Sequence, residues 1–281
     1  MKRLLFIIGA LLITNIILCQ NILPPKPRDI SKTKIIDQSN LRITYSLDFK
    51  YSEQTKEYNK DTRVVLVGDR IIKDYSYIVY SFDSTLTVMS KRGAHGVPML
   101  QQIIYPYEIY NNYETGKTLL TYRTLGDGTI LRFFDNQPLF KWELKEGYKT
   151  ILGYKCQQAT TRFAGRDYTA WFTMEIPVDA GPYKFNGLPG LILKVEESTG
   201  FFVWTAIGIS RNNEPIVEYE LNKYQNCTRK QADETIKRMF ASPISFINSS
   251  GAKVMTYGKD GNLVEITTVN EIPIPYEPLE R

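Results

Sequence analysis

The sequence predicts a mainly β protein, with an antiparallel, strongly curved or half-barrel sheet and one amphipathic helix packed on it. Three observations predict this fold. From residue 41 onward, short alternating or apolar runs recur about every eight to twelve residues, which is typical of closed or curved antiparallel sheets. Turn residues separate these runs, and a single segment has helical instead of two-residue periodicity.

Each expected strand either alternates apolar with polar residues or forms a short apolar run between turns. The strongest hairpin signal is Gly126-Asp127-Gly128, because glycine tolerates the positive φ that tight turns need. We expect strands over residues 41–47, 63–67, 70–79, 86–89, 118–124, 129–134, 138–144, 155–163, 168–174, 191–196, 201–209 and 217–223.

Residues 228–240 have the pattern of one amphipathic helix. Thr228 is a candidate N-cap, and Gln231 completes a capping box. An apolar stripe then recurs at helical spacing, at Ala232, Ile236, Met239 and Phe240. We expect this stripe to pack on the sheet, and binding of a partner or a membrane is the alternative.

The amino terminus has the pattern of a signal peptide: a cationic start, an apolar run of about 15 residues and then a proline-rich polar stretch. We expect residues 1–19 to be this signal, residues 20–40 an extended segment and residues 41–281 a single β-rich domain. The mature protein would be exported to the periplasm, the outer membrane or the extracellular space, without a transmembrane anchor. Lipidation of Cys19 is the alternative to cleavage before or after Gln20.

Charge and composition exclude several kinds of site. The chain of 281 residues has a net charge of +5, and its basic residues are scattered, which argues against nucleic acid as a partner. It has one histidine, His95, and no acidic calcium-binding loop, so we expect no metal site and no cofactor.

Two cysteines, Cys156 and Cys227, remain after signal removal. In an oxidising compartment this pair is consistent with one disulfide, and two small buried hydrophobic residues are the equal alternative. A catalytic thiol is disfavoured, since neither cysteine has an obvious base nearby in the sequence.

The most distinctive stretch is a double turn over Asn186, Gly187, Leu188, Pro189 and Gly190. Asn-Gly is a turn pair, and Pro-Gly suits the central positions of a type II turn. The apolar run that follows at once predicts a buried strand.

Residues 187–192, Gly-Leu-Pro-Gly-Leu-Ile, spell the signature of the GLPGLI family of exported Bacteroidetes proteins, which the chain resembles. Residues 151–156, 170–173 and 270–275 support the resemblance. It implies export and no established activity, so no catalytic residues are carried over. The hairpin before the Trp171 strand also resembles the half-barrel sheets of periplasmic lipoprotein-carrier-like proteins, in which a helix lies in the concave face.

An enzyme is not expected from the residues. His95 lies in a glycine-rich loop with Asp83, Ser84, Ser90 and Asp127 as nominal triad partners, but no Gly-x-Ser-x-Gly elbow is present. Glu196 and Glu197 are adjacent on one expected strand, so they point to opposite faces. A secreted hydrolase is kept as the last alternative.

The abundant tyrosines favour a binding protein. The candidate ligand-binding residues are Tyr105, Tyr107, Tyr75, Tyr77 and Trp171, whose rings offer large apolar faces. The alternative is that tyrosine simply fits a half-buried pleated sheet. We therefore expect a non-catalytic carrier of an apolar ligand such as a lipid. An accessory protein that docks onto an outer-membrane or other envelope protein is the alternative.

Overall fold

The computed structural model describes residues 24–94, 100, 102–126, 128–250, 255–257, 261–265 and 271–281. The mainly β prediction is confirmed. The described strands are β1 (Thr33–Phe49), β2 (Asn59–Gly68), β3 (Ile71–Ser76), β4 (Tyr107–Asn112), β5 (Lys117–Arg123), β6 (Ile130–Asn136), β7 (Glu143–Ile151), β8 (Tyr154–Phe163), β9 (Arg166–Thr173), β10 (Leu191–Glu197), β11 (Phe202–Arg211), β12 (Pro215–Tyr219), β13 (Tyr224–Asn226), β14 (Met255–Tyr257) and β15 (Leu263–Glu265).

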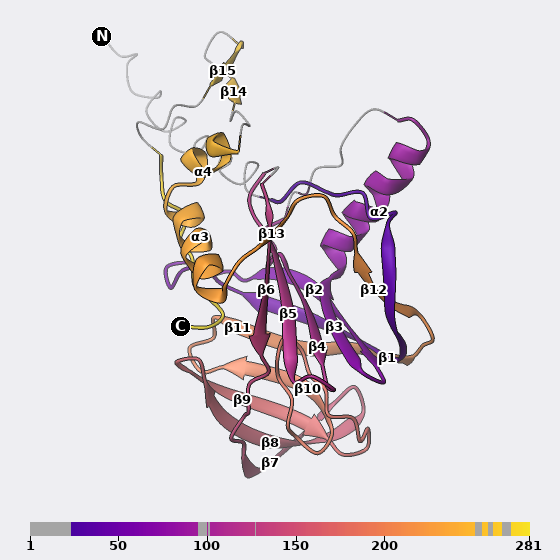
Figure 1. Cartoon of the computed structure of the whole chain (residues 1–281). Coiled ribbons are helices and arrows are strands. Elements are labelled where there is room, and N and C mark those ends of the chain that lie inside the picture. Colours follow the sequence, from indigo (N-terminus) through magenta and orange to yellow (C-terminus); the bar gives the residue numbers. More distant parts are fainter. Residues whose placement is uncertain are drawn as a thin grey trace, which may run out of the picture.

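Thirteen of the described strands form one sheet, in the order β13-β6-β5-β4-β3-β2-β1-β11-β10-β9-β8-β7, with β12 paired to β1. Every pairing in it is antiparallel except that of β13 with β6. The strands β3–β6 cross β8–β10 at a steep angle (Figure 1). Side chains from both parts, such as Phe133 of β6 and Phe172 of β9, belong to one buried cluster, so the sheet bends around its own core.

Strand β1 joins the two parts of the sheet. Its first residues pair with β12, and from Leu41 to Phe49 it pairs with β2 on one side and β11 on the other. The boundary expected at residue 41, between an extended segment and the β-rich domain, therefore falls inside β1. Ile43, Tyr45 and Leu47 alternate inward and are fully buried, as the period of two predicts.

The expected hairpins β2–β3, β5–β6, β8–β9 and β10–β11 are confirmed. The expected strand over residues 138–144 is wrong for most of its length, because β7 begins only at Glu143. The preceding Phe140 and Trp142 stack on each other instead, with ring centroids 5.4 Å apart. Packing of these two rings against the core thus replaces the strand pairing that the alternation of apolar and polar residues predicted.

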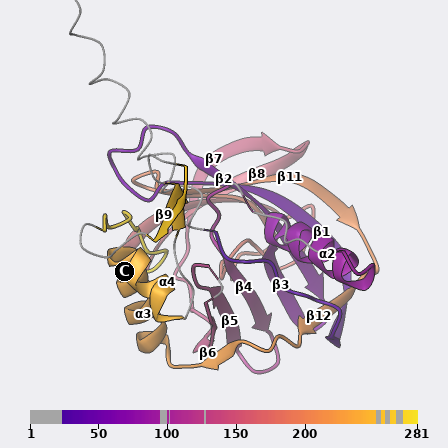
Figure 2. The same ribbon diagram turned by 90° about the horizontal axis from the view of Figure 1, so that it is seen from above.

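The described residues contain three helices, α2 (Tyr77–Lys91), α3 (Arg229–Ala241) and α4 (Pro243–Ser249), so the expectation of one helix is wrong. Seen from above, α3 and α2 lie at opposite sides of β3–β6 (Figure 2). In α3 the capping box of Thr228 and Gln231 is confirmed, and so is the buried stripe of Ala232, Ile236, Met239 and Phe240.

Helix α2 replaces the last three residues of the strand expected over residues 70–79, which ends at Ser76 as β3, and all of the strand expected over residues 86–89. The Ser76 side chain accepts a hydrogen bond from the N–H of Val79, which caps the helix. The β-branched residues of this segment suggested strands, but no glycine or proline interrupts it, and its buried face consists of Asp83 and Thr87. A polar buried face gives no apolar helical stripe for sequence reasoning to detect.

The double turn delivers strand β10 as predicted, but not through a type II turn. Gly187 has φ +85°, so a side chain there would be strained. The N–H of Gly190 bonds the carbonyl of Leu188 at 2.8 Å, while that of Leu191 bonds Ile176 at 3.0 Å. In a type II turn the Leu191 N–H would bond the Leu188 carbonyl, but here it bonds Ile176. A tighter three-residue turn centred on Pro189 forms instead.

Both Cys156 and Cys227 are free thiols, so the expected disulfide is not present. Cys156 lies in β8 and Cys227 follows β13, and these strands lie near opposite ends of the strand order. The expected signal peptide, Cys19, Gln20, His95 and Asp127 lie outside the described residues. Within the described part of the chain, no helix is long and apolar enough to cross a membrane.

Candidate functional site

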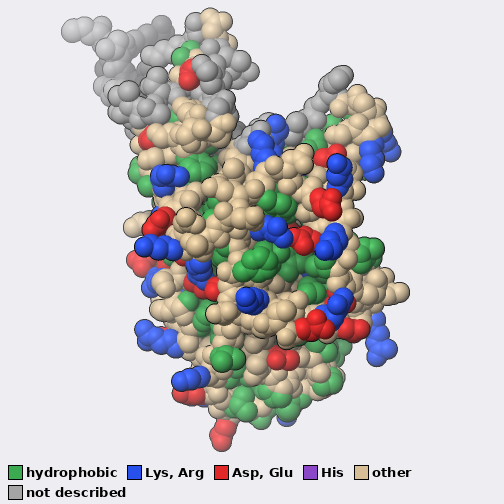
Figure 3. Space-filling view, viewed as in Figure 1, with side chains coloured by type: hydrophobic (Ala, Val, Ile, Leu, Met, Phe, Trp, Pro, Cys, Tyr) green, Lys and Arg blue, Asp and Glu red, His purple; other side chains and the backbone are tan. Residues whose placement is uncertain are grey.

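Strands β3–β6 bury one face in the main core and turn the other face outward. Because side chains alternate along a strand, Tyr107 and Ile109 of β4 enter the core while Glu108 and Tyr110 lie on the opposite, outer face. Figure 3 shows this outer face, where hydrophobic side chains lie between basic and acidic ones over β4, β5 and β6. The mixture differs from the aromatic and aliphatic interior.

A groove with a volume of about 440 Å³ lies on this outer face. Residues from several parts of the chain line it: Ile36, Arg70, Ile71, Tyr110, Asn112, Glu114, Thr115, Lys117, Leu119, Arg132, Phe134 and Glu218. Its apolar floor includes Ile71, Tyr110 and Leu119, which belong to a second buried cluster under this face. The strands position the floor, and the β4–β5 turn and β12 supply much of the rim.

Phe134 is the one large hydrophobic side chain of the groove lining that is mainly exposed, at 64%. It lies on β6 opposite Leu119 of β5, on the outer face of the pair. Its ring therefore presents an apolar face to whatever occupies the groove. Its neighbour Phe133 points inward and is buried.

Ion pairs and backbone hydrogen bonds order the rim of the groove. Arg132 pairs with Glu218 of β12, and its guanidinium lies 5.4 Å from the ring centroid of Tyr224. The Asp37 carboxylate accepts hydrogen bonds from the N–H groups of Arg70 at 2.8 Å and Ile71 at 2.9 Å. Burial disfavours the charged Asp37, but these N–H groups outweigh it and lower the pKa of the carboxyl group.

The β4–β5 turn presents a second carboxylate to the groove. The Asn112 side chain accepts hydrogen bonds from the N–H groups of Glu114 at 2.9 Å and Thr115 at 3.0 Å. These bonds fix the turn, so the Glu114 side chain is placed by a rigid backbone while remaining exposed. The groove therefore combines an exposed ring, cations and two carboxylates, Glu114 and Glu218.

The buried charged side chains beside the groove stabilise the fold and do not face a ligand. Lys73 is buried, pairs with Glu108 at 2.9 Å and donates to the Val217 carbonyl at 2.8 Å. Asp83 of α2 is buried and accepts two hydrogen bonds from Arg123. Burial raises the pKa of Asp83, but its oxygens are occupied by these donors and by the N–H of Arg28, so it has no access to a ligand. Asp83 fastens α2 to the sheet.

The five residues expected to bind a ligand do not form one site. Tyr105 and Tyr107 lie in the main core, with ring centroids 6.0 Å apart. Tyr75 is buried on the outer face, and Tyr77 is exposed at the start of α2. Trp171 lies on β9 in the other part of the sheet, where the Lys149 ammonium is 3.9 Å from its ring centroid.

Sequence reasoning missed the groove residues Phe134, Arg132, Lys117 and Glu218. The alternation within β6 was a detectable signal for Phe134, since Leu131 and Phe133 occupy the inward positions. Nothing local could bring Glu218 to Arg132, because 86 residues separate them. In the described ranges, no three His, Cys, Asp or Glu residues cluster so that they could bind a metal ion.

Comparison with known proteins identifies the family. The family model described as N-glycanase peptide, N-terminal domain, matches residues 56–236, which is more than half of the chain. The chain belongs to this family. Among curated proteins, none matches the sequence.

Two solved structures of PNGF-II, in space groups P21 and C2, are similar to the chain. Each has 15% sequence identity and a TM-score of 0.47, and the match covers 70% of this chain and 32% of the other. The chain therefore spans about a third of the length of those structures.

Membership of the N-glycanase N-terminal-domain family corrects three expectations. The resemblance to the GLPGLI family is wrong, since residues 187–192 lie within the region that the N-glycanase family model matches. A non-catalytic carrier of an apolar ligand is also contradicted, since the matching family model is described as the N-terminal domain of an N-glycanase peptide. For the same reason the expectation that the chain is not an enzyme is overturned, and the hydrolase alternative fits better.

Proposed function

We propose that this chain takes part in the hydrolytic removal of N-linked glycans from proteins and that the groove on the outer face binds the glycan. The observation that carries the proposal is the exposed Phe134 ring in a groove of about 440 Å³ with charged and amide groups around it. The family match supplies the reaction class. Fold alone would not, since one fold serves many activities.

The groove has the chemistry that an oligosaccharide requires. A sugar ring has an apolar C–H face, which an exposed aromatic ring covers, and hydroxyl groups around its edge, which need polar partners. Phe134 supplies the ring, while Asn112, Thr115 and Lys117 supply donors and acceptors. A volume of about 440 Å³ lies within the range of small-molecule sites.

Hydrolysis of the amide that links a glycan to asparagine needs a proton for the leaving nitrogen and an activated water. Glu114 and Glu218 are the carboxylates of the groove lining, so we assign them as candidates for these two roles. Glu218 is held by its ion pair with Arg132, and we assign it the activation of water. We assign Glu114, on the β4–β5 turn across the groove lining, the donation of the proton.

The test measures both glycan release and glycan binding with the full chain. Release from an N-glycosylated protein is followed by mass spectrometry, and binding of a free N-glycan by calorimetry. Phe134→Ala should weaken binding by about fivefold, because stacking on an aromatic ring is worth about 1 kcal/mol. Leu139→Ala is the matched control, since Leu139 is 96% exposed and does not line the groove.

Glu218→Gln and Glu114→Gln separate the two roles. If the proposal is correct, each variant binds the glycan while release falls by about a hundredfold or more. Unchanged binding by Phe134→Ala, or release that neither glutamine variant reduces, would refute the assignment of the groove. A wild-type chain that neither binds nor releases N-glycans would refute the proposed function itself.

Export belongs to this proposal, because N-glycosylated proteins are found outside the cytoplasm. We retain delivery to the periplasm, outer membrane or extracellular space, and a partner in the envelope, as predictions. The description of the bent sheet as a half-barrel is likewise proposed, and it is supported by the core that β5 and β6 share with β9 and β10.

A further inference from the structure

The segment over residues 271–281, here called the closing segment, lies against the inner side of the molecule without forming a strand. Five of its backbone groups bond to the rest of the chain. The carbonyl of Glu277 accepts a hydrogen bond from the Tyr105 hydroxyl at 2.8 Å, that of Pro278 from the Arg166 guanidinium at 2.6 Å, and that of Leu279 from the Tyr168 hydroxyl at 3.3 Å. The N–H of Ile274 donates to the Phe240 carbonyl at 2.8 Å, and the N–H of Arg281 to the Ala164 carbonyl at 3.0 Å.

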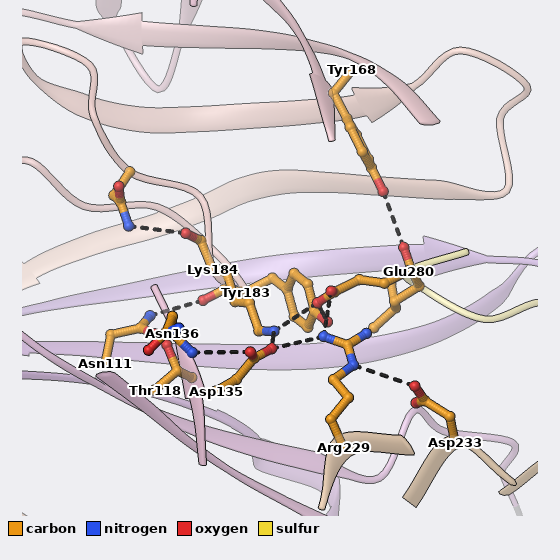
Figure 4. A network of polar contacts seen from close by, with 12 residues as sticks. Asn111, Thr118, Asp135, Asn136, Tyr168, Tyr183, Lys184, Arg229, Asp233 and Glu280 are labelled. Carbon is orange, nitrogen blue, oxygen red and sulfur yellow. Dashed lines mark hydrogen bonds and ion pairs between the residues drawn. The ribbon is translucent and has the colours of Figure 1, made fainter. Parts of the chain in front are cut away.

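One side chain of the closing segment, Glu280, enters a pocket between the sheet and α3. Figure 4 shows Lys184 and Arg229 pointing toward the carboxylates of Glu280 and Asp135. The Lys184 ammonium lies 2.8 Å from each of the two carboxylates, and Arg229 lies 2.5 Å from Glu280 and 2.8 Å from Asp135. The Tyr183 hydroxyl also donates to Glu280.

Glu280 supplies one of the two carboxylates that pair with both cations of this pocket. Two cations, Lys184 and Arg229, face two anions, Asp135 and Glu280, and Lys184 is only 1% exposed. Asp233 also pairs with Arg229, but from the exposed side of α3 and at 3.3 Å. Removing Glu280 leaves the buried Lys184 with a single carboxylate for two cations, and burial makes such an imbalance costly.

A cavity of about 50 Å³ adjoins the pocket. Glu280, Tyr276, Pro278 and Leu279 of the closing segment form part of its wall. The remaining wall is aromatic and aliphatic: Tyr105, Tyr107, Leu120, Tyr122, Phe133, Tyr183 and Ile236, with Arg229 and Asp233 at the α3 side. When the closing segment leaves, this surface opens as a concave site with net positive charge at one end.

We propose that this pocket is a binding site for extended acidic peptides and that Glu280 occupies it as an internal ligand. The internal ligand shows what the site accepts. Its backbone is recognised through carbonyl groups, which any peptide has, and its carboxylate is recognised by Lys184, Arg229 and Tyr183. A peptide with a glutamate in the corresponding position would restore the charge balance. The site lies on the opposite face from the groove and is independent of the proposed function.

The experiment uses the full chain with Glu280→Lys, which places a cation against Lys184 and Arg229 and expels the side chain. The probe is the fluorescein-labelled peptide Tyr-Glu-Pro-Leu-Glu-Arg, which has the sequence of residues 276–281. Fluorescence anisotropy measures its binding. The variant should bind it at least about tenfold more tightly than the wild type, in which the tethered segment competes at an effective concentration of about millimolar.

The matched control is the same peptide with glutamine in place of its second glutamate. It should bind the variant about tenfold to a hundredfold more weakly, because a charge-assisted hydrogen bond is lost. A folded variant that does not bind the acidic peptide, or that binds both peptides equally, would overturn the proposal.

Hydrogen exchange on the wild-type chain tests the proposal without any variant. The amides of Ile274 and Arg281 should exchange faster than those in the middle of α3, and millimolar acidic peptide should accelerate them further. Exchange of these amides only together with α3, or insensitivity to the peptide, would show that the segment is a fixed part of the fold and would overturn the proposal.

Discussion

Replacing Asp74 by asparagine should destabilise the protein strongly. Asp74 and its partner Arg63 are both fully buried, and the guanidinium bonds Asp74 through Nε at 2.9 Å and Nη2 at 2.7 Å. Arg63 also bonds Asp61 at 3.2 Å and lies 3.8 Å from the ring centroid of Tyr107. The other Asp74 oxygen accepts the N–H of Tyr183 at 2.7 Å, just before the double turn.

The expected magnitude follows from which partner remains. Asparagine can still accept the Tyr183 N–H, so the change removes the charge and spares the backbone bond. Arg63 then keeps Asp61 as its one carboxylate partner, at 3.2 Å, beside the carbonyl groups of Tyr105 and Tyr107. Breaking a buried ion pair on one side costs about 3–5 kcal/mol, and the contact to Asp61 places this case near 3 kcal/mol. That is a large part of a typical free energy of unfolding of about 5–15 kcal/mol.

Urea denaturation followed by circular dichroism measures the change. Glu143→Gln is the control, because Glu143 is 74% exposed in its pair with Lys145 and its replacement should leave the free energy of unfolding almost unchanged. A loss below about 1 kcal/mol for Asp74→Asn would refute the reasoning.

Three further predictions concern the turn, the helix cap and acid stability. Gly190→Ala should lower the free energy of unfolding by at least about 2 kcal/mol in thermal melts, because a Cβ there would lie 2.1 Å from a carbonyl oxygen; Gly153→Ala, with no atom within 4 Å, should cost less. Thr228→Ala should cost about 1 kcal/mol and Thr228→Ser almost nothing, a contrast that urea midpoints resolve. Burial opposes ionisation of Glu280 and Asp135, but the neighbouring cations outweigh it and lower the pKa of both carboxyl groups. The two carboxylates therefore stabilise the folded protein above the ordinary pKa values of 4.5 and 3.8, and this stabilisation is lost as the pH falls below them. Base-catalysed exchange slows as the pH falls from 5 to 3, so hydrogen exchange of the closing segment should slow less than this chemistry alone requires, and the difference should be absent in Glu280→Gln with Asp135→Asn.

Features that depend on neighbours in the sequence were predictable. Helix α3 was correct in its cap, its stripe and its end, because a capping box and an apolar period are local properties. The hairpins were predictable for the same reason, since alternating strands around a Gly-containing turn have few other ways to bury their apolar face. Helix α2 was missed because its buried positions, Asp83 and Thr87, are polar and find their partners elsewhere in the fold.

The candidate sites depend on contacts across the chain. Outward-pointing Phe134 was visible in the alternation of β6, but its position at a groove follows from β12 crossing the sheet. The five aromatic residues expected to form one site were dispersed among the core, α2 and the far part of the sheet. Sequence shows that a ring belongs to a strand but not which face of a bent sheet remains open.

By itself the sequence determined the class of the fold, the strand pairs of four hairpins and the position of helix α3, because these follow from periodicity, turn residues and caps within about 20 residues of chain. Only the tertiary structure decided where the chain can bind anything. Strand β1 pairs with both β2 and β11 and so joins the two parts of the sheet, and the bend of the sheet separates an open outer face from an inner face that the closing segment covers. Glu218 reaches Arg132, and Glu280 reaches Lys184, across 86 and 96 residues, distances over which no local pattern specifies a contact.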